Sequence, residues 1–148
     1  MNWIEYFRGI AHQVKLKSKD VRTQIGAVVV GHDHEILSTG YNSFPRGIND
    51  HLPSRQERPE KYYWFEHAER NAIYNAARIG VSLKDSTMYL TCGMCCTDCT
   101  RGIINSGIKQ VYLERDGGAK GELWDEHAKR SEQMFKEAGV EIHYYEKI

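Results

Sequence analysis

The sequence predicts an α/β sandwich in which helices cover a central sheet. Three observations lead to this fold class. Helical and β-branched segments alternate along most of the chain, an early pair of short strands is separated by a turn and so predicts a hairpin, and the length of 148 residues corresponds to one domain over residues 1–148. Strands that alternate with helices form a sheet with helices packed on it.

The first half of the chain predicts a helix, a hairpin and a long loop. Apolar side chains recur at helical spacing over residues 3–14. Two short strands, residues 26–30 and 35–39, flank a turn at residues 31–34. All three prolines fall within residues 40–62, where the periodicity is lost. A loop of that length in a compact domain is usually a lid or a binding loop.

The second half predicts three helices that alternate with three strands. An aromatic run at residues 62–65 precedes the first of these helices, and we expect its side chains to lie in the core. Gly80, Gly107 and Gly139 end the three helices. The elements are a helix from about residue 65 to 79, a strand at 87–91, a helix at 97–106, a strand at 109–114, a helix at 124–138 and a strand at 140–145.

The balance of charges favours a small ligand over a polynucleotide. The chain has 20 Lys and Arg and 20 Asp and Glu, so its formal net charge is zero. Proteins that bind tRNA or single-stranded DNA need clustered cations to neutralise phosphates, so we expect no nucleic-acid partner. The first residues carry charges where a signal peptide would be apolar, and no apolar run approaches the roughly 20 residues that span a bilayer. We therefore expect a cytoplasmic protein with no membrane partner.

All four cysteines lie between Cys92 and Cys99. A disulfide framework needs Cys residues spread along the chain to close loops, so this cluster excludes one. Cysteines this close together indicate metal binding or thiol chemistry in a reducing compartment.

Two segments, each at the predicted start of a helix, carry the residue types of a catalytic metal site. They are His67-Ala68-Glu69 and Cys96-Thr97-Asp98-Cys99. One His and a C-x2-C pair provide three ligands for tetrahedral Zn²⁺, and three protein ligands leave a fourth position open, as in catalytic zinc sites. The partial positive charge at a helix N-terminus favours thiolates over thiols. Glu69 lies two residues from His67, where it can shuttle protons without competing for the metal.

Two alternatives remain open at this point. Cys92-Gly93-Met94-Cys95 is itself a C-x2-C, so the zinc ligands can be Cys92 and Cys95 instead of Cys96 and Cys99. Alternatively, all four cysteines form a structural zinc knuckle that only organises a loop. The knuckle leaves the pairing of His67 with Glu69 unexplained, and its two C-x2-C pairs would abut instead of lying on separate turns.

The motifs resemble those of the deoxycytidylate (dCMP) deaminase family. H-x-E followed by C-x-x-C is the signature of zinc-dependent nucleobase deaminases. The resemblance extends from about Trp3 to Tyr144, and residues 40–47, Gly-Tyr-Asn-Ser-Phe-Pro-Arg-Gly, are similar to the family's Gly-Tyr-Asn-Gly-x-Pro loop. The interval from Cys99 to residues 106–108 matches the family's interval after its second cysteine ligand. On this basis Cys96 and Cys99 are the favoured pair.

The resemblance implies a fold, a reaction and a set of roles. The fold is the cytidine-deaminase-like α/β/α sandwich with a central five-stranded mixed sheet. The reaction is zinc-dependent hydrolytic deamination of dCMP to dUMP and ammonia; the alternative is a different nucleotide, nucleoside or modified base, including dCTP, at the same zinc site. The residues it implies are His67, Cys96 and Cys99 as ligands of Zn²⁺, Glu69 as the catalytic acid and base, and Asn42 as the deoxyribose contact.

The phosphate contact is inferred from the need for a cation. Arg46, in the long loop and with Lys61 nearby, is the favoured residue for binding a monophosphate. Members of the family are often homo-oligomers, hexamers among them, and some respond to dCTP and dTTP, so the same partners are expected here.

The sequence departs from the family pattern in three places. Cys95 stands where the family has a proline, the loop before Cys96 is one residue longer, and Ser43 replaces the glycine after Asn42. The first two departures lie in the loop at residues 92–95, called the metal loop below, and the third lies beside the expected sugar contact Asn42.

Overall fold

The computed structural model describes residues 1–145, so the last three residues of the predicted domain lie outside the described part. Its five strands are β1 Gly26–Val30, β2 Ile36–Tyr41, β3 Thr87–Leu90, β4 Gln110–Leu113 and β5 Glu141–Tyr144. They form one sheet in the order β2–β1–β3–β4–β5. β1 pairs antiparallel with β2 and β3, whereas β3, β4 and β5 are parallel, so the predicted five-stranded mixed sheet is confirmed.

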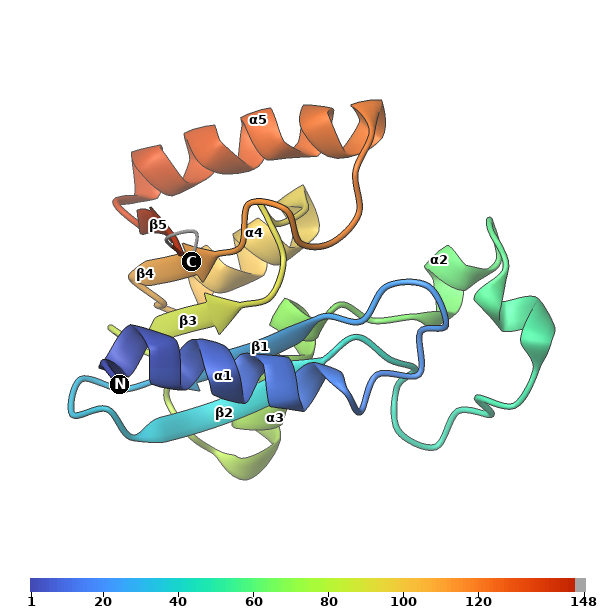
Figure 1. Cartoon of the computed structure of the whole chain (residues 1–148), viewed down its shortest axis with the longest axis horizontal. Helices are drawn as coiled ribbons and strands as arrows, with labels where there is room; N and C mark the ends of the chain where they lie inside the picture. Colours follow the sequence, from blue (N-terminus) through green and yellow to red (C-terminus); the bar gives the residue numbers. More distant parts are fainter. Residues whose placement is uncertain (146–148) are drawn as a thin grey trace.

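Helices pack on both faces of this sheet. They are α1 Trp3–Lys15, α2 Lys61–Trp64, α3 Ala68–Ile79, α4 Thr97–Asn105 and α5 Glu122–Ala138, with a 3₁₀ turn at Pro53–Gln56. α1 packs on one face, while α3, α4 and α5 contribute to the core on the other (Figure 1). Within residues 1–145, no helix is both long enough and apolar enough to cross a membrane.

The fully buried strand β1 separates two hydrophobic clusters. Successive side chains of a strand point to opposite faces of the sheet. Val28 and Val30 accordingly pack in the cluster that contains the buried side of α1, whereas Ala27 and Val29 belong to the larger cluster formed with α3, α4 and α5. This two-sided burial explains why β1 is an unbroken apolar run instead of an alternating one.

Gly40 allows α3 to lie very close to the sheet. A Cβ at this position would be 2.4 Å from the backbone nitrogen of Ala72 and 2.5 Å from the carbonyl oxygen of Ala68, so no larger residue fits. Ala72 also accepts a hydrogen bond from the Ser38 hydroxyl at 2.6 Å. The start of α3 is therefore held against the end of β2, and this start carries His67 and Glu69.

Several predicted boundaries move by one to three residues. The second strand continues to Tyr41, and α3 begins at Ala68 instead of residue 65, because His67 is an extended N-cap. The long loop projects from the end of the sheet (Figure 1) and contains the 3₁₀ turn and α2, which sequence periodicity missed because each has only four residues.

The prediction that the aromatic run at residues 62–65 lies in the core is wrong. Tyr62 is 57% exposed and Tyr63 is 80% exposed, and Trp64 and Phe65 are only partly buried. The guanidinium of Arg55 lies 3.6 Å from the centroid of the Trp64 ring, so a cation–π contact supports this side chain outside the core.

A buried ion pair attaches the long loop to the rest of the protein. The Lys61 ammonium lies 2.7 Å from Asp20 Oδ2, and both side chains are largely buried. Asp20 also accepts hydrogen bonds from the backbone amides of Arg22 and Thr23. Burial acts to raise the pKa of the Asp20 carboxyl, but the hydrogen bonds from Lys61 and the two amides outweigh it, so the pKa is lowered.

Replacing Asp20 tests this attachment. Asp20→Asn leaves the Lys61 ammonium buried without its counterion, so we expect the free energy of unfolding at pH 7 to fall by about 3 kcal/mol. Because the carboxyl has a lowered pKa in the folded state, the advantage of the wild type is complete above its ordinary value of 3.8 and is lost as the pH falls through the lowered pKa.

Urea unfolding of both proteins at several pH values measures the difference. The control is Asp33→Asn in the exposed turn before β2, which should change the unfolding free energy by no more than about 0.5 kcal/mol. Equal stability of Asp20→Asn and wild type at pH 7 would contradict the assigned role of the ion pair.

Candidate active site

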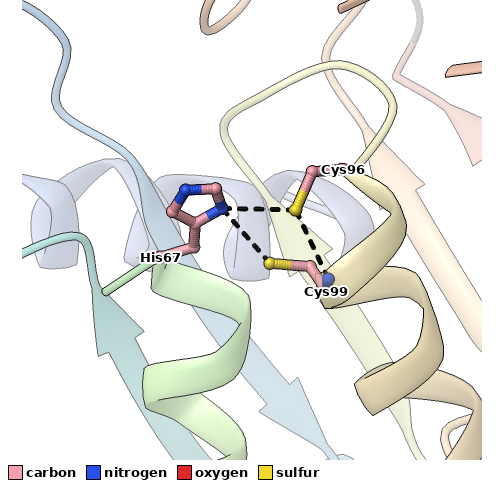
Figure 2. Close-up of side chains that lie close together, drawn as sticks. All are labelled: His67, Cys96 and Cys99. Atoms are coloured by element: carbon pink, nitrogen blue, oxygen red, sulfur yellow. Dashed lines mark hydrogen bonds between the residues drawn. The ribbon is translucent and has the colours of Figure 1, made fainter. Parts of the chain in front are cut away.

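Two helix starts meet at one end of the sheet. His67 is the N-cap of α3 and Cys96 is the N-cap of α4, and both have extended backbone conformations immediately before the first helical residue. Figure 2 shows their side chains, together with that of Cys99 from the first turn of α4, pointing toward one another. The positive ends of two helices therefore lie at the same point, which favours thiolate sulfur there.

The donor atoms of these three residues have the spacing of a zinc site. His67 Nδ1 lies 3.4 Å from Cys96 Sγ and 3.4 Å from Cys99 Sγ, and all three donor atoms lie within 4.8 Å of one another. Zn–N and Zn–S bonds of 2.0–2.3 Å at tetrahedral angles place N and S about 3.6 Å apart. Within residues 1–145, this is the one group of three His, Cys, Asp or Glu donors that converges in this way. One nitrogen and two sulfurs therefore fit zinc.

Among the four cysteines, Cys96 alone has a lowered pKa. The hydrogen bond with Cys99, followed by the contact with His67, lowers the pKa of the Cys96 thiol, whereas the same bond to Cys96 raises the pKa of Cys99. Burial raises the pKa of Cys92 and Cys95 well above the ordinary value. Because a thiolate is the metal ligand, the neutral thiols of Cys92 and Cys95 are poorer ligands than Cys96.

Glu69 is buried beside the three donors. It is 5% exposed, and burial raises the pKa of its carboxyl even though the nearby charge of His67 acts to lower it. The carboxyl hydrogen-bonds with the thiols of Cys95 and Cys99. Burial acts to lower the pKa of the His67 imidazole. The hydrogen bond of His67 with Cys96 and the charge of Glu69 outweigh burial, so this pKa is raised. Burial thus favours the protonated form of the Glu69 carboxyl relative to an exposed glutamate.

Arg70 links the two helix starts. Its guanidinium lies 2.6 Å from Glu66, the residue that precedes His67, and 3.5 Å from Asp98 in the first turn of α4. Glu66 is in turn paired with Ser43 through two backbone hydrogen bonds of 2.8 and 3.1 Å. These backbone bonds hold the chain that leads into His67, and they do not depend on the side chain at position 43.

A cavity of about 840 Å³ opens over His67 and Glu69. Its walls come from the long loop, the metal loop, the segment after β4 and the first turns of α5. The Trp124 ring centroid lies 6.4 Å from that of His67, so this indole forms part of the wall next to the donors. Residues used below that line the cavity are Asn42, Arg58, Lys61, Tyr62, Phe65, Arg115, Lys120, Trp124 and His127.

The amide of Asn42 is fixed by its neighbours at the edge of this cavity. Its Nδ2 donates to the Thr23 carbonyl at 2.7 Å and to Asp20 at 3.3 Å, and its Oδ1 accepts from the Ile25 amide at 2.8 Å. An amide oxygen has two acceptor positions. One of them remains for a hydroxyl group of a ligand.

Arg46 is not brought to the cavity. Its side chain is exposed, and it is absent from the cavity wall, although Lys61 and Asn42 are part of that wall. The prediction placed Arg46 near the phosphate only because it was the nearest cation in the loop sequence. The folded loop instead presents Arg58, Lys61 and the aromatic side chains of Tyr62 and Phe65.

His127 was missed by sequence reasoning. It lies in α5, lines the cavity and contacts Thr97 at the start of α4. No motif marks it, and its distance of 30 residues from Thr97 hides the contact. A single polar residue at a helical position is normally assigned to the solvated face.

Comparison with known sequences identifies relatives along the whole chain. Residues 1–115 match the family described as the cytidine and deoxycytidylate deaminase zinc-binding region. An uncharacterized deaminase in the luxG 3′ region of Aliivibrio fischeri is 36% identical over 140 residues, which are 95% of this chain and 91% of that protein. Human deoxycytidylate deaminase is 36% identical over 121 residues, and the match covers 78% of this chain and 66% of the human protein.

A solved structure has the same fold. The dCMP deaminase of cyanophage S-TIM5, crystallised in complex with dCMP and dUMP, superposes with a TM-score of 0.75 at 25% identity, and the match covers 95% of each chain. The family match includes His67, Glu69, Cys96 and Cys99, the residues whose side chains converge beneath the cavity. The chain therefore belongs to the cytidine and deoxycytidylate deaminase family.

Proposed function

We propose that this protein catalyses the hydrolytic deamination of dCMP to dUMP and ammonia. The observation that carries the proposal is the convergence of His67, Cys96 and Cys99, with Glu69 buried beside them, beneath a cavity large enough for a nucleotide. The human relative is a deoxycytidylate deaminase, and the structural relative from cyanophage S-TIM5 was crystallised with dCMP and dUMP.

In this proposal His67 Nδ1, Cys96 Sγ and Cys99 Sγ hold a zinc ion. When bound, zinc with three protein ligands would lower the pKa of a water molecule to about 7 and would so supply a nucleophile at neutral pH. The spacing of the three donors and the lowered pKa of Cys96 support this ligand set over Cys92 and Cys95.

Glu69 moves the protons of the reaction. Its carboxylate accepts a proton from the attacking water and delivers it to the ring nitrogen next to C4. The oxygen of that water bonds to C4 in the same step. The carboxylate then takes the second proton, from the hydroxyl group now on C4, and gives it to the amine as the C4–N bond breaks and the C4=O bond forms, so the amine leaves as ammonia. The buried position supports this role, because burial raises the pKa of Glu69 toward the range in which it can both accept and donate.

Binding of the nucleotide is assigned to the cavity walls. The remaining acceptor position of Asn42 Oδ1 receives a hydrogen bond from a deoxyribose hydroxyl. The 5′-phosphate requires cations, and Arg58, Arg115 and Lys120 line the cavity, whereas Lys61 is occupied by Asp20. We therefore replace the predicted phosphate contact Arg46 by cations of the cavity wall.

Further properties expected from the sequence stay predictions. They are one deaminase domain over residues 1–148, a homo-oligomer such as a hexamer, dCTP and dTTP as effectors, and a cytoplasmic location. Size-exclusion chromatography with and without each nucleotide tests the oligomer and the effectors together.

Ammonia release by the zinc-loaded protein tests the reaction. The substrates are dCMP, dCTP, deoxycytidine, cytidine and cytosine, and we expect turnover of dCMP to exceed that of the four others, because the cations of the cavity wall and the acceptor at Asn42 recognise both ends of the nucleotide. If the zinc-loaded protein releases no ammonia from any of the five compounds, the metal site stands but the proposed substrate is wrong.

Glu69→Gln tests the proton transfers. The amide keeps the shape of the side chain but cannot accept the proton, so turnover of dCMP should fall by about 10²- to 10⁴-fold. Zinc content and the dissociation constant for dCMP should stay close to the wild type. Glu132→Gln, on an exposed part of α5, is the matched control and should keep full activity. A wild-type rate in Glu69→Gln would remove Glu69 from the mechanism.

Removal of single cysteines tests the ligand set. Cys96→Ala deletes one of the three converging donors, so the purified protein should contain little zinc by atomic emission spectroscopy. Cys92→Ala removes a neighbouring buried thiol that lies outside the converging group, and it should retain one zinc per chain. The opposite pattern, zinc lost in Cys92→Ala and kept in Cys96→Ala, would assign the ligands to Cys92 and Cys95.

A further inference from the structure

One face of α5 packs against the metal loop. Trp124, His127 and Ser131 are spaced by three and four residues, so they lie on the same side of the helix. The Trp124 ring is 6.4 Å from the His67 ring and 5.9 Å from the His127 ring, measured between centroids. α5 therefore reaches the site through three side chains, each directed at a different part of it.

Two hydrogen bonds from this face bracket Cys96. The backbone amide of Thr97 lies 3.1 Å from His127 Nδ1, and the Ser131 hydroxyl donates to the Cys95 carbonyl oxygen at 2.8 Å. These backbone groups belong to the residues immediately after and immediately before Cys96. Ser131 is fully buried, so its bond is shielded from water.

The bond to Thr97 defines the tautomer of His127. A backbone N–H can only donate, so Nδ1 must be the acceptor and carries no proton. The proton of the neutral ring is then on Nε2. No residue among 1–145 pairs with Nε2 through a hydrogen bond shown in the structure, and the His127 side chain lines the cavity.

The hydrogen bond to His127 Nδ1 gives the Thr97 amide an acceptor that α4 itself cannot provide. Thr97 is the first residue of α4, and the first amides of an α-helix have no partner within the helix. Nδ1 of His127 thus caps α4 from another helix, while the N-cap side chain of Cys96 accepts from the amide of Cys99. Without His127, the Thr97 amide would have to find water or shift, and Cys96 would shift with it.

We propose that His127 is a positioning residue for the metal ligand Cys96. It acts by accepting the hydrogen bond of the Thr97 amide, and together with Ser131 it holds the peptide units on both sides of the ligand. The inference rests on the proposed function in one respect, namely that Cys96 binds the metal. It adds a link between the cavity wall formed by α5 and the metal, because Trp124 lies one turn before His127 on the same face.

Two substitutions of His127 distinguish the effect of the hydrogen-bond acceptor Nδ1 from the effect of the ring's size and shape. His127→Phe keeps a planar ring but has no acceptor, so the zinc dissociation constant should rise about tenfold, the lower end of the effect found for residues that support metal ligands. Asn Oδ1 takes the same position along the side chain as His Nδ1, so His127→Asn should restore zinc affinity to within about twofold of the wild type.

Replacing Thr97 provides the complementary test. Proline is favoured at the first position of a helix, where its missing N–H is not needed by the helix itself. Cys96 has φ −65° and ψ 163°, which is the conformation that a following proline requires. The Thr97 hydroxyl also lies 3.1 Å from His127 Nδ1, so Thr97→Pro removes both donors, the amide and the hydroxyl, with little strain. In this background His127→Phe should change the zinc dissociation constant by less than about twofold, because the bond is already absent.

The measurements are zinc affinity by competition with a chromophoric chelator and the absorption spectrum of the Co²⁺-substituted protein. Urea unfolding of each apoprotein shows whether the variants fold. The expected result is weaker zinc binding and altered sulfur-to-cobalt bands in His127→Phe, with both restored in His127→Asn.

The proposal is overturned by any of three results. The first is that His127→Phe binds zinc as tightly as the wild type. The second is that His127→Asn loses as much zinc affinity as His127→Phe. The third is that His127→Phe still raises the zinc dissociation constant about tenfold in the Thr97→Pro background. Zinc content of Cys96→Ala and dCMP turnover by the wild type are measured in parallel. If these two fail, the proposed function is wrong; if they succeed and the His127 series does not, only the positioning role is wrong.

Discussion

The site depends on the close approach of two helix N-termini. His67 Nδ1 can lie 3.4 Å from two sulfurs only if the starts of α3 and α4 are held almost in contact. Gly40 lets α3 settle against β2, which sets the position of His67. Arg70 then joins the two starts through carboxylates on either side. Both positive helix ends face each other there, and the thiolate favoured at Cys96 offsets that repulsion.

Around this centre the cavity has two walls that are attached to the protein in different ways. The buried pair of Asp20 and Lys61 attaches the long loop, and the same carboxylate accepts a hydrogen bond from Asn42. The opposite wall is α5, attached through His127 and Ser131. The long loop is thus attached away from the converging donors, whereas α5 is attached to the residues on either side of Cys96.

The sequence was sufficient for the parts of the molecule that local pattern determines. The strands and helices followed from hydrophobic period, and the residues at the two helix starts followed from a spacing that zinc chemistry requires. Arg46 and the aromatic run could not be placed, because the path of a loop depends on contacts such as Lys61 with Asp20 that no periodicity encodes. His127 was hidden for the same reason: its partner lies on another helix, and one polar residue leaves no repeating signal.

The cluster of four cysteines shows how position determines the chemistry of one residue type. Cys96 and Cys99 lie at a helix N-terminus beside His67, where thiolate is favoured at Cys96 and both sulfurs point to a common centre. Cys92 and Cys95 are buried in the loop before that helix, where burial keeps their thiols neutral. Neutral thiols behave as small apolar groups with a weak S–H donor. They thus complete the low-polarity surroundings that raise the pKa of Glu69, while Cys95 still provides a hydrogen-bonding partner for its carboxyl. A proline in place of Cys95 would have no S–H, so in this chain the carboxyl of Glu69 has a thiol partner that a proline cannot provide.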